Sequence, residues 1–302
     1  MNRTLFSFGR ARRGLGLAFV AGLFALASAA WAQQTFPTPD AAAAAFVDSL
    51  ARSDDDATKA VLGPDWRKYV PADDVKANDL TNILEAWSKS HRIVPAGDAK
   101  AYLEVGTHGW TLPIPIEKTA AGWRFDTKGT PDELRTRRIG RNELDVIQVV
   151  LALTDAQEDY SAYAAASTGS KQFAQKILSS PGKRDGLYWA TLAGEPPSPL
   201  GPIAEGSKRG QAYHGYHYKI LTAQGKAAPG GAKSYVANGR MTGGYAVVAW
   251  PEKYGDTGVM TFITDRSGVV YQKNLGEKTA EIAKAMTAFD PDASWTKVAP
   301  TK

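Results

Sequence analysis

The residues with the most distinctive chemistry lie in the run Tyr213–Tyr218, which holds two histidines and three tyrosines. His214 and His217 have the spacing of some metal sites. In a strand, however, alternate side chains point to opposite faces, so these two imidazoles diverge. The other two histidines lie in the first half of the chain, and we expect no metal and no cofactor. The run indicates a strand with an aromatic packing face or an aromatic wall beside a ligand, with His214 and Tyr216 as candidate binding residues.

A second candidate site is the charged and aromatic run Lys183–Trp189, which is followed by the proline-rich segment 194–202. Loops of this length in compact domains are usually functional or disordered, and aromatic side chains argue against disorder. Aromatic residues beside arginine and aspartate are typical of recognition surfaces. In the alternative interpretation, the charges pin the loop and the aromatic rings cover the core. The candidate binding residues of this run are Lys183, Arg184, Asp185, Tyr188 and Trp189.

Three arginines gather in the segment Arg137–Glu143. Guanidinium groups can hold a carboxylate or a phosphate through paired hydrogen bonds, which makes Arg138 and Arg141 candidate binding residues. Alternatively, these arginines form ion pairs that cross-link two domains. The glycine-rich segment Asn238–Gly244 lacks the strand–loop–helix context of a phosphate-binding loop. We expect a hairpin or bulge there, with Arg240 as the last candidate binding residue.

The sequence gives little support to nucleophilic catalysis. There is no cysteine, which excludes disulfides, thiolate metal sites and a cysteine nucleophile. Ser198 and Ser207 lack the surrounding glycines of a nucleophile elbow. A carboxylate beside an imidazole is the minimum for general acid–base catalysis, so a hydrolase would use Asp185 or Glu195 with His214. We assign no catalytic residue.

The first 32 residues have the features of a secretory signal peptide: an arginine-rich start, an apolar run over 15–27 and a small-residue site at Ala30–Ala32. The apolar run is too short for a spanning helix. We expect cleavage near Ala32 and a periplasmic or secreted protein with no transmembrane segment in its mature chain. The peptide carries four of the 36 lysines and arginines and no acid, which leaves 32 basic residues against 31 acidic ones. A near-neutral surface argues against nucleic acid as a partner.

Residues 33–128 are predicted to form a small α+β domain. Thr38, followed by Pro39, indicates the start of a first helix, and the apolar periodicity of 79–91 indicates a later one. Strands are expected over 101–106, 110–116 and 123–125. The second strand belongs at an edge or bulge, because its two prolines donate no ladder hydrogen bond. This order of elements resembles the cone of nuclear-transport-factor-2-like proteins.

Residues 130–302 are predicted to form a second α+β domain around a long helix over 130–163. Thr130 and Glu133 form a capping-box pattern, and from Leu144 the helix is apolar round most of its girth, as in a buried spine. Asp145 belongs to a narrow polar stripe that we expect to face solvent. Strands are expected over 213–221, 245–250, 259–264 and 269–273. A long helix followed by an antiparallel meander resembles the head of type IV pilins and pseudopilins, although the charged start of the helix argues against a filament subunit.

Several phrases, in chain order, are similar to the secreted bacterial family catalogued as domain of unknown function 2950. They are Ile114–Ile116, Gly122–Asp126, Arg138–Leu144, Pro181–Trp189, Gly194–Pro199, Tyr213–Tyr216 and Asn238–Gly244. The resemblance covers essentially the whole mature chain. It implies an export signal, but no agreed activity, cofactor or substrate.

The missing catalytic constellation favours a non-enzymatic envelope protein. In this hypothesis the Lys183–Pro202 loop and the Tyr213–Tyr218 strand form the surface that binds a partner protein or a glycan. The alternative is a periplasmic hydrolase or a small-ligand-binding protein. In its ligand-binding form, an apolar pocket of the first domain lies near Trp110 and Trp123.

Overall fold

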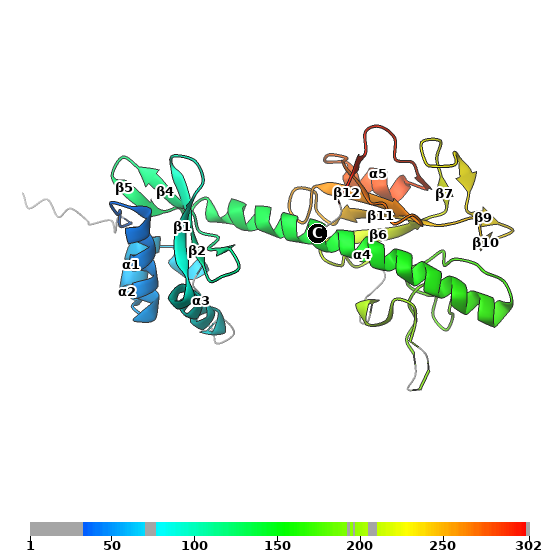
Figure 1. The fold of residues 1–302 in the computed structure, drawn as a ribbon, viewed down its shortest axis with the longest axis horizontal. Coiled ribbons are helices and arrows are strands. Elements are labelled where there is room, and N and C mark those ends of the chain that lie inside the picture. Colours follow the sequence, from blue (N-terminus) through cyan, green and yellow to red (C-terminus); the bar gives the residue numbers. More distant parts are fainter. Residues whose placement is uncertain (1–32, 70–76, 192–193, 196, 205–209, 300–302) are drawn as a thin grey trace, which may run out of the picture.

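The structure is a computed structural model that describes residues 33–69, 77–191, 194–195, 197–204 and 210–299. The predicted signal peptide lies outside the described residues. A long helix, α4, runs from the helices and strands of the N-terminal part to a larger group of strands in the C-terminal part (Figure 1). The buried side chains form two hydrophobic clusters, one before α4 and one that begins within it.

The N-terminal part packs helices against an antiparallel sheet. Its elements are α1 (Pro39–Ala51), α2 (Asp55–Leu62), a 3-10 turn η1 (Trp66–Lys68), α3 (Ala77–Lys89), β1 (His91–Pro95), β2 (Lys100–Val105), β3 (Trp110–Thr111), β4 (Ile116–Thr119) and β5 (Gly122–Phe125). The strand order is β1-β2-β4-β5, and β3 pairs with β2. Phe46 of α1 and Phe125 of β5 meet in the core with their ring centroids 5.2 Å apart.

The helix signals of this part are confirmed, whereas the strands differ: β1 was not predicted, and the strand predicted over 110–116 is shortened. Thr38 caps α1 by accepting a hydrogen bond from the backbone N–H of Ala41 at 3.1 Å. The expected strand 110–116 is reduced to the two residues of β3, and pairing resumes only at β4. Pro113 and Pro115 lie between these two strands, where they lack the N–H that a longer ladder needs.

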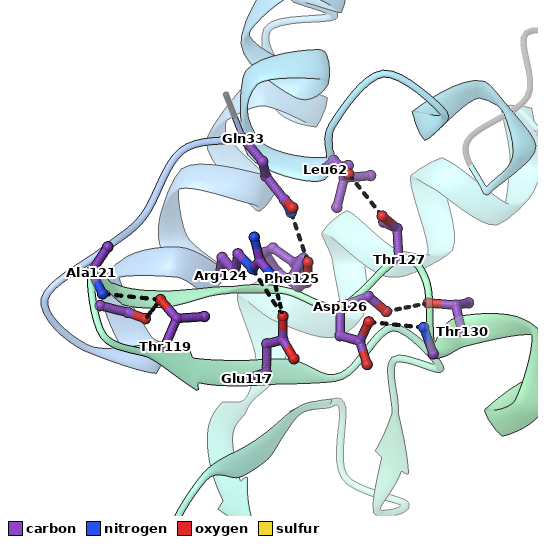
Figure 2. Close-up of polar contacts among 12 residues, drawn as sticks. Gln33, Leu62, Glu117, Thr119, Ala121, Arg124, Phe125, Asp126, Thr127 and Thr130 are labelled. Atoms are coloured by element: carbon purple, nitrogen blue, oxygen red, sulfur yellow. Dashed lines mark hydrogen bonds and ion pairs between the residues drawn. The ribbon is translucent and has the colours of Figure 1, made fainter. Parts of the chain in front are cut away.

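The end of β5 is tied both to the N-terminal helices and to the start of α4 (Figure 2). The Gln33 side chain donates to the Phe125 carbonyl at 2.7 Å, and the Thr127 hydroxyl donates to the Leu62 carbonyl at 3.2 Å. Asp126 then accepts twice, from the Gly129 N–H and from the Thr130 hydroxyl, each at 2.8 Å. These bonds set the direction in which α4 leaves the sheet.

Helix α4 (Thr130–Thr168) has 39 residues, which corresponds to a length of about 58 Å at 1.5 Å per residue. The predicted capping box does not form: Gly129 is the N-cap, and the Glu133 carboxylate instead accepts from Tyr102 and Arg137. The helix is buried along one face rather than all round, since Leu144 is 57% exposed while the residues that follow are largely covered.

The C-terminal part is built around a five-stranded antiparallel sheet in the order β15-β13-β12-β11-β6. Its main elements are β6 (Tyr216–Leu221), β11 (Ala246–Pro251), β12 (Met260–Asp265), β13 (Tyr271–Asn274), α5 (Thr279–Ala285) and β15 (Thr296–Lys297). Shorter pieces are a 3-10 turn η3 (Gly201–Ala204), β7 (Ala223–Gln224), β8 (Lys233–Ser234), β9 (Val236–Ala237), β10 (Arg240–Met241) and β14 (Ala288–Phe289).

Both faces of this sheet are covered. All six residues of β11 are buried, because α4 packs against one face of the sheet and α5 lies over the other (Figure 1). A strand covered on both sides is apolar at every position rather than alternating, which explains the run Ala246–Trp250. The α+β class is confirmed. The likenesses to the nuclear-transport-factor-2-like cone and to the pilin head stay predictions.

Candidate functional site

The arginine-rich segment of α4 holds the loop between β11 and β12. Arg138 pairs with the Asp256 carboxylate, and the Asn142 amide donates to the Thr257 carbonyl at 2.8 Å. The Glu143 carboxylate accepts from the N–H groups of Val259 and Met260 at 2.8 and 2.9 Å. Each contact joins the helix to the sheet. Of the two predicted binding residues, Arg138 therefore has a partner within the fold, whereas Arg141 is exposed.

Asp185 closes the turn that begins the Lys183–Trp189 loop. Its carboxylate accepts from the Ser180 N–H at 2.7 Å and the Ser180 hydroxyl at 3.0 Å, and it pairs with Lys176 at 2.7 Å. These donors stabilise the charged form and hold the pKa of Asp185 well below its usual range, with the Lys176 hydrogen bond as the largest cause. A carboxylate so strongly held is suited to fixing a loop rather than to accepting a proton at neutral pH.

The rest of the loop is organised round Trp189, which is buried. The Arg184 guanidinium lies 5.6 Å from the centre of its ring and pairs with Glu195 at 2.9 Å. Tyr163 of α4 packs on the same ring at 5.1 Å. These contacts match the interpretation in which charges pin the loop and aromatic rings cover the core.

His214 stands in a tight turn before β6, with a left-handed backbone (φ 50°). The turn is closed by two backbone hydrogen bonds between Tyr213 and Tyr216 at 2.8 and 3.1 Å. The Nδ1 atom of His214 lies 3.0 Å from the Asp145 carboxylate on α4, and both side chains are half-exposed. Tyr216, the other predicted binding residue of this run, is fully buried and donates its hydroxyl to the Met260 carbonyl.

A hollow of about 290 Å³ lies where the loop, α4 and β6 meet. We call it the edge hollow. Its lining is mainly apolar, and it includes Val149 and Leu153 of α4, Ile177 and Leu178 of the segment that precedes the loop, and Tyr218 and Ile220 of β6. Tyr213 and Leu200 also line it, so the two regions predicted to form a binding surface face the same cavity.

A second hollow of about 480 Å³ adjoins the first at Leu178. We call it the loop hollow. Four of the predicted binding residues line it together with Glu195, namely Lys183, Arg184, Tyr188 and Trp189. The structure thus brings these four residues together, but it gives Asp185 and Tyr216 places within the fold. Arg240 lies on β10 and is exposed.

The main residue that sequence reasoning missed is Asp145, which was expected to face solvent and instead pairs with His214. Its signal is present in the sequence, because Asp145 interrupts an otherwise apolar run beside Val146 and Ile147. The carboxylates proposed for a hydrolase have other neighbours, Lys176 for Asp185 and Arg184 for Glu195. Nothing in the sequence distinguishes the aliphatic residues that line the edge hollow, because any packed core uses the same residue types.

The N-terminal part has a larger hollow of about 640 Å³, the N-terminal hollow. It lies between α3, the β2–β3 connection and the first turns of α4, and Ile83, Leu112 and Ile114 line it. Trp110 and Leu134 also line it and remain 46% and 44% exposed. Trp110 is therefore at an apolar pocket as expected. Trp123 instead pairs its backbone with Phe36, by two hydrogen bonds of 2.7 and 2.8 Å.

Neither a membrane span nor a metal site emerges from the described part of the chain. None of its helices combines the length and the apolar character needed to cross a bilayer. Within the same residues, no three carboxylate or imidazole side chains converge as ligands for one ion.

These features define a class of α+β protein in which one long helix joins a small helix-and-sheet unit to a larger sheet with an apolar hollow at its edge strand. The chain belongs to the family described as protein of unknown function (DUF2950), whose family model matches residues 33–298. No curated protein and no solved structure matches the chain.

Proposed function

We propose that this protein is exported from the cytoplasm and acts in the cell envelope as a non-enzymatic module that binds a partner protein. Export is supported by the signal-peptide features of the first 32 residues and by a family match that begins at residue 33. Binding rather than catalysis is supported by the contacts of the two carboxylates predicted for a hydrolase, because Asp185 pairs with Lys176 and Glu195 with Arg184. The carboxylate beside His214 is Asp145, and neither residue of this pair lines the edge hollow.

The observation that carries this proposal is the edge hollow. It is mainly apolar, it opens on the surface, and its walls come from α4, the segment 175–178 and β6, with Leu200 of the Lys183–Pro202 loop and Tyr213 at its border. When a partner covers the apolar surface of such a hollow, the free energy falls by about 25 cal/mol per Å². Aliphatic walls such as those of Val149 and Ile177 suit an apolar side chain of a protein better than a sugar ring with its many hydroxyl groups.

Site-specific photo-cross-linking in intact bacteria tests the proposal. The signal-bearing protein with a C-terminal tag would carry p-benzoylphenylalanine in place of Tyr213, at the mouth of the edge hollow. The control carries it in place of Leu144, an exposed residue of α4 that does not line the hollow. We expect a discrete protein adduct from position 213 and none from position 144. No adduct at position 213, or equal adducts at both positions, would contradict the proposal.

A second candidate function, the binding of a small apolar ligand, is favoured by the N-terminal hollow. Its volume lies in the range of ligand pockets, and Trp110 and Leu134 leave large apolar surfaces uncovered there. Titration with the fluorescent apolar anion anilinonaphthalene sulfonate tests this function. We expect Leu134→Asp to weaken binding at least tenfold and Leu144→Asp to leave it unchanged. Equal binding by both variants would place the probe elsewhere.

A further inference from the structure

Strand β6 is an end strand of the five-stranded sheet, and its pairing fixes which of its backbone groups point outward. The Glu252 N–H donates to the Gly215 carbonyl at 2.9 Å, and the same antiparallel register continues to Leu221 opposite Ala246. In an antiparallel ladder only every second residue bonds to a given neighbour. Residues 217, 219 and 221 therefore bond to β11, and residues 216, 218 and 220 direct their N–H and C=O groups to the outer edge.

The described residues close this edge at its two ends but not between them. Tyr216 exchanges both of its outward hydrogen bonds with Tyr213 in the turn that holds His214. Beyond the strand, the Thr222 N–H donates to Thr287 at 3.2 Å, and the Thr222 carbonyl accepts from Tyr235 at 2.8 Å. For the outward N–H and C=O groups of Tyr218 and Ile220, the described residues supply no hydrogen-bond partner.

Together with Lys219 between them, these two residues are the part of β6 that lines the edge hollow. Their side chains lie on the face of the sheet toward α4, as shown by Tyr216, which shares their parity and reaches Glu143 of that helix. Lys219 has the opposite parity and donates to the Lys284 and Met286 carbonyls at the end of α5. The unpaired backbone groups therefore border a cavity whose walls are apolar.

We propose that an extended segment of the partner protein adds to the outer edge of β6 as a sixth strand, pairing with the backbone of Tyr218 and Ile220. This inference rests on the proposed function and names the chemistry of its partner. Donors and acceptors two residues apart in a strand are spaced about 6.6–6.8 Å, which an extended main chain matches residue for residue. Closure at Tyr216 and at Thr222 limits the added strand to three or four paired residues.

The segment also carries an apolar side chain that enters the edge hollow. The two lysines of the lining are already engaged, Lys176 with Asp185 and Lys219 with the end of α5. No carboxylate belongs to the part of the lining that the structure describes. An uncharged, aliphatic or aromatic side chain therefore fits this cavity better than a charged one.

The test starts from the adduct at position 213. Its cross-linked segment is mapped and synthesised as a peptide, and a second series carries N-methyl groups on alternate residues. In an extended peptide, the backbone N–H groups of alternate residues point to opposite edges, so one set faces β6 and the other faces away. N-methylation removes the donor at each methylated residue. We expect methylation of one parity to weaken binding to the purified protein at least tenfold and methylation of the other to leave it within twofold.

Two variants of Ile220 provide the matched test on the protein side. Of the backbone hydrogen-bonding groups, proline at this position removes only the outward N–H, which no bond within the sheet uses. Alanine keeps that donor and controls for the loss of the isoleucine side chain. We expect Ile220→Pro to lose the unmethylated peptide and Ile220→Ala to retain it. In the native protein, the amide protons of Tyr218 and Ile220 should exchange faster than that of Lys219 and slow on binding.

Three results would overturn the inference, and they differ in what they imply for the function. A cross-link at position 213 with no parity effect would leave the binding module in place and remove strand addition. Absence of any cross-link would remove both. A dimer in solution that Ile220→Pro converts to monomer would show that a second copy of the chain, rather than a partner, occupies the edge.

Discussion

At the scale of single residues, the charged side chains of this protein mostly organise its loops. Asp185 is the clearest case, because two donors of Ser180 and the ammonium of Lys176 converge on one carboxylate. Glu143 does the same for the start of β12. Motifs that resemble recognition sites in the sequence thus turn out to hold backbone in place, whereas the edge hollow is lined mainly by apolar residues.

Asp185→Asn is expected to lower the free energy of unfolding by about 1 kcal/mol at pH 7, a value limited by the partial exposure of the pair. The folded-state pKa of Asp185 is depressed. Its contribution is therefore present above the unfolded-state pKa of about 3.9 and is lost as the pH falls toward the folded-state pKa. Urea unfolding should show a gap between wild type and variant at pH 7 that narrows below about pH 4.

Asp159→Asn is the matched control, since Asp159 is an exposed residue of α4. It should match wild type at pH 7. A gap for Asp185→Asn that stays constant from pH 7 to pH 3 would mean that the carboxylate charge has no part in holding the loop.

At the scale of elements, local signals located the helices well because caps and apolar periodicity are written in adjacent residues. Thr38 starts α1 as expected, and the central strands β11 and β12 lie within one residue of their predictions. Prediction failed for strands whose hydrogen-bonding neighbour is distant in the sequence. Strand β1 was missed, and the two-residue strands such as β7 exist only through pairing with β8 and β14.

The same division applies to the candidate site. Aromatic and charged residues marked the loop and the turn before β6, but the edge hollow depends on which strand lies at the end of the sheet. That property follows from tertiary pairing and not from the sequence of β6. The Asp145–His214 pair was missed for the same reason, because it joins residues 69 positions apart in the chain.

Two glycines, one on an exposed position of α4 and one in the loop between β11 and β12, should respond to alanine in opposite directions. Gly140 lies within α4 with nothing within 4 Å of an added Cβ, so Gly140→Ala should raise the free energy of unfolding by about 0.5–1 kcal/mol. At Gly258 an added Cβ would lie 2.0 Å from the hydroxyl oxygen of Tyr216, which is bonded to the Met260 carbonyl. Gly258→Ala should therefore lower stability by about 1–3 kcal/mol.

Denaturant titration of both variants against wild type measures these changes. Tyr216→Phe combined with Gly258→Ala should recover little of the loss, because the added Cβ also meets ring carbons of residue 216 that phenylalanine keeps. If Gly258→Ala were as stable as wild type, the close approach of the β11–β12 loop to β6 would not exist in solution.

At the scale of the whole molecule, two neighbouring residues of α4 bond to different parts of the chain, one to the N-terminal part and one to the C-terminal part. Arg137 donates to the Thr111 carbonyl and, at 2.9 Å, to the Thr111 hydroxyl in the N-terminal part. Arg138 pairs with Asp256 in the C-terminal part. Because these side chains leave adjacent positions of one continuous helix, little free helix remains between the two attachments, and we expect the two parts to keep a fixed mutual orientation.

The absence of cysteine allows this expectation to be measured directly, because any introduced pair of thiols can be spin-labelled without background. Labels at Lys89→Cys on α3 and Glu281→Cys on α5 report the separation of the two parts by electron–electron double resonance. The parent should give one narrow distance distribution, which Arg137→Ala with Arg138→Ala should broaden. Arg135→Ala with Arg141→Ala is the control, because Arg135 pairs within the helix and Arg141 is exposed. A broad distribution in the parent, or equal broadening in the control, would mean that α4 tethers the two parts without orienting them, so that a partner at the edge hollow would leave the N-terminal hollow free to move.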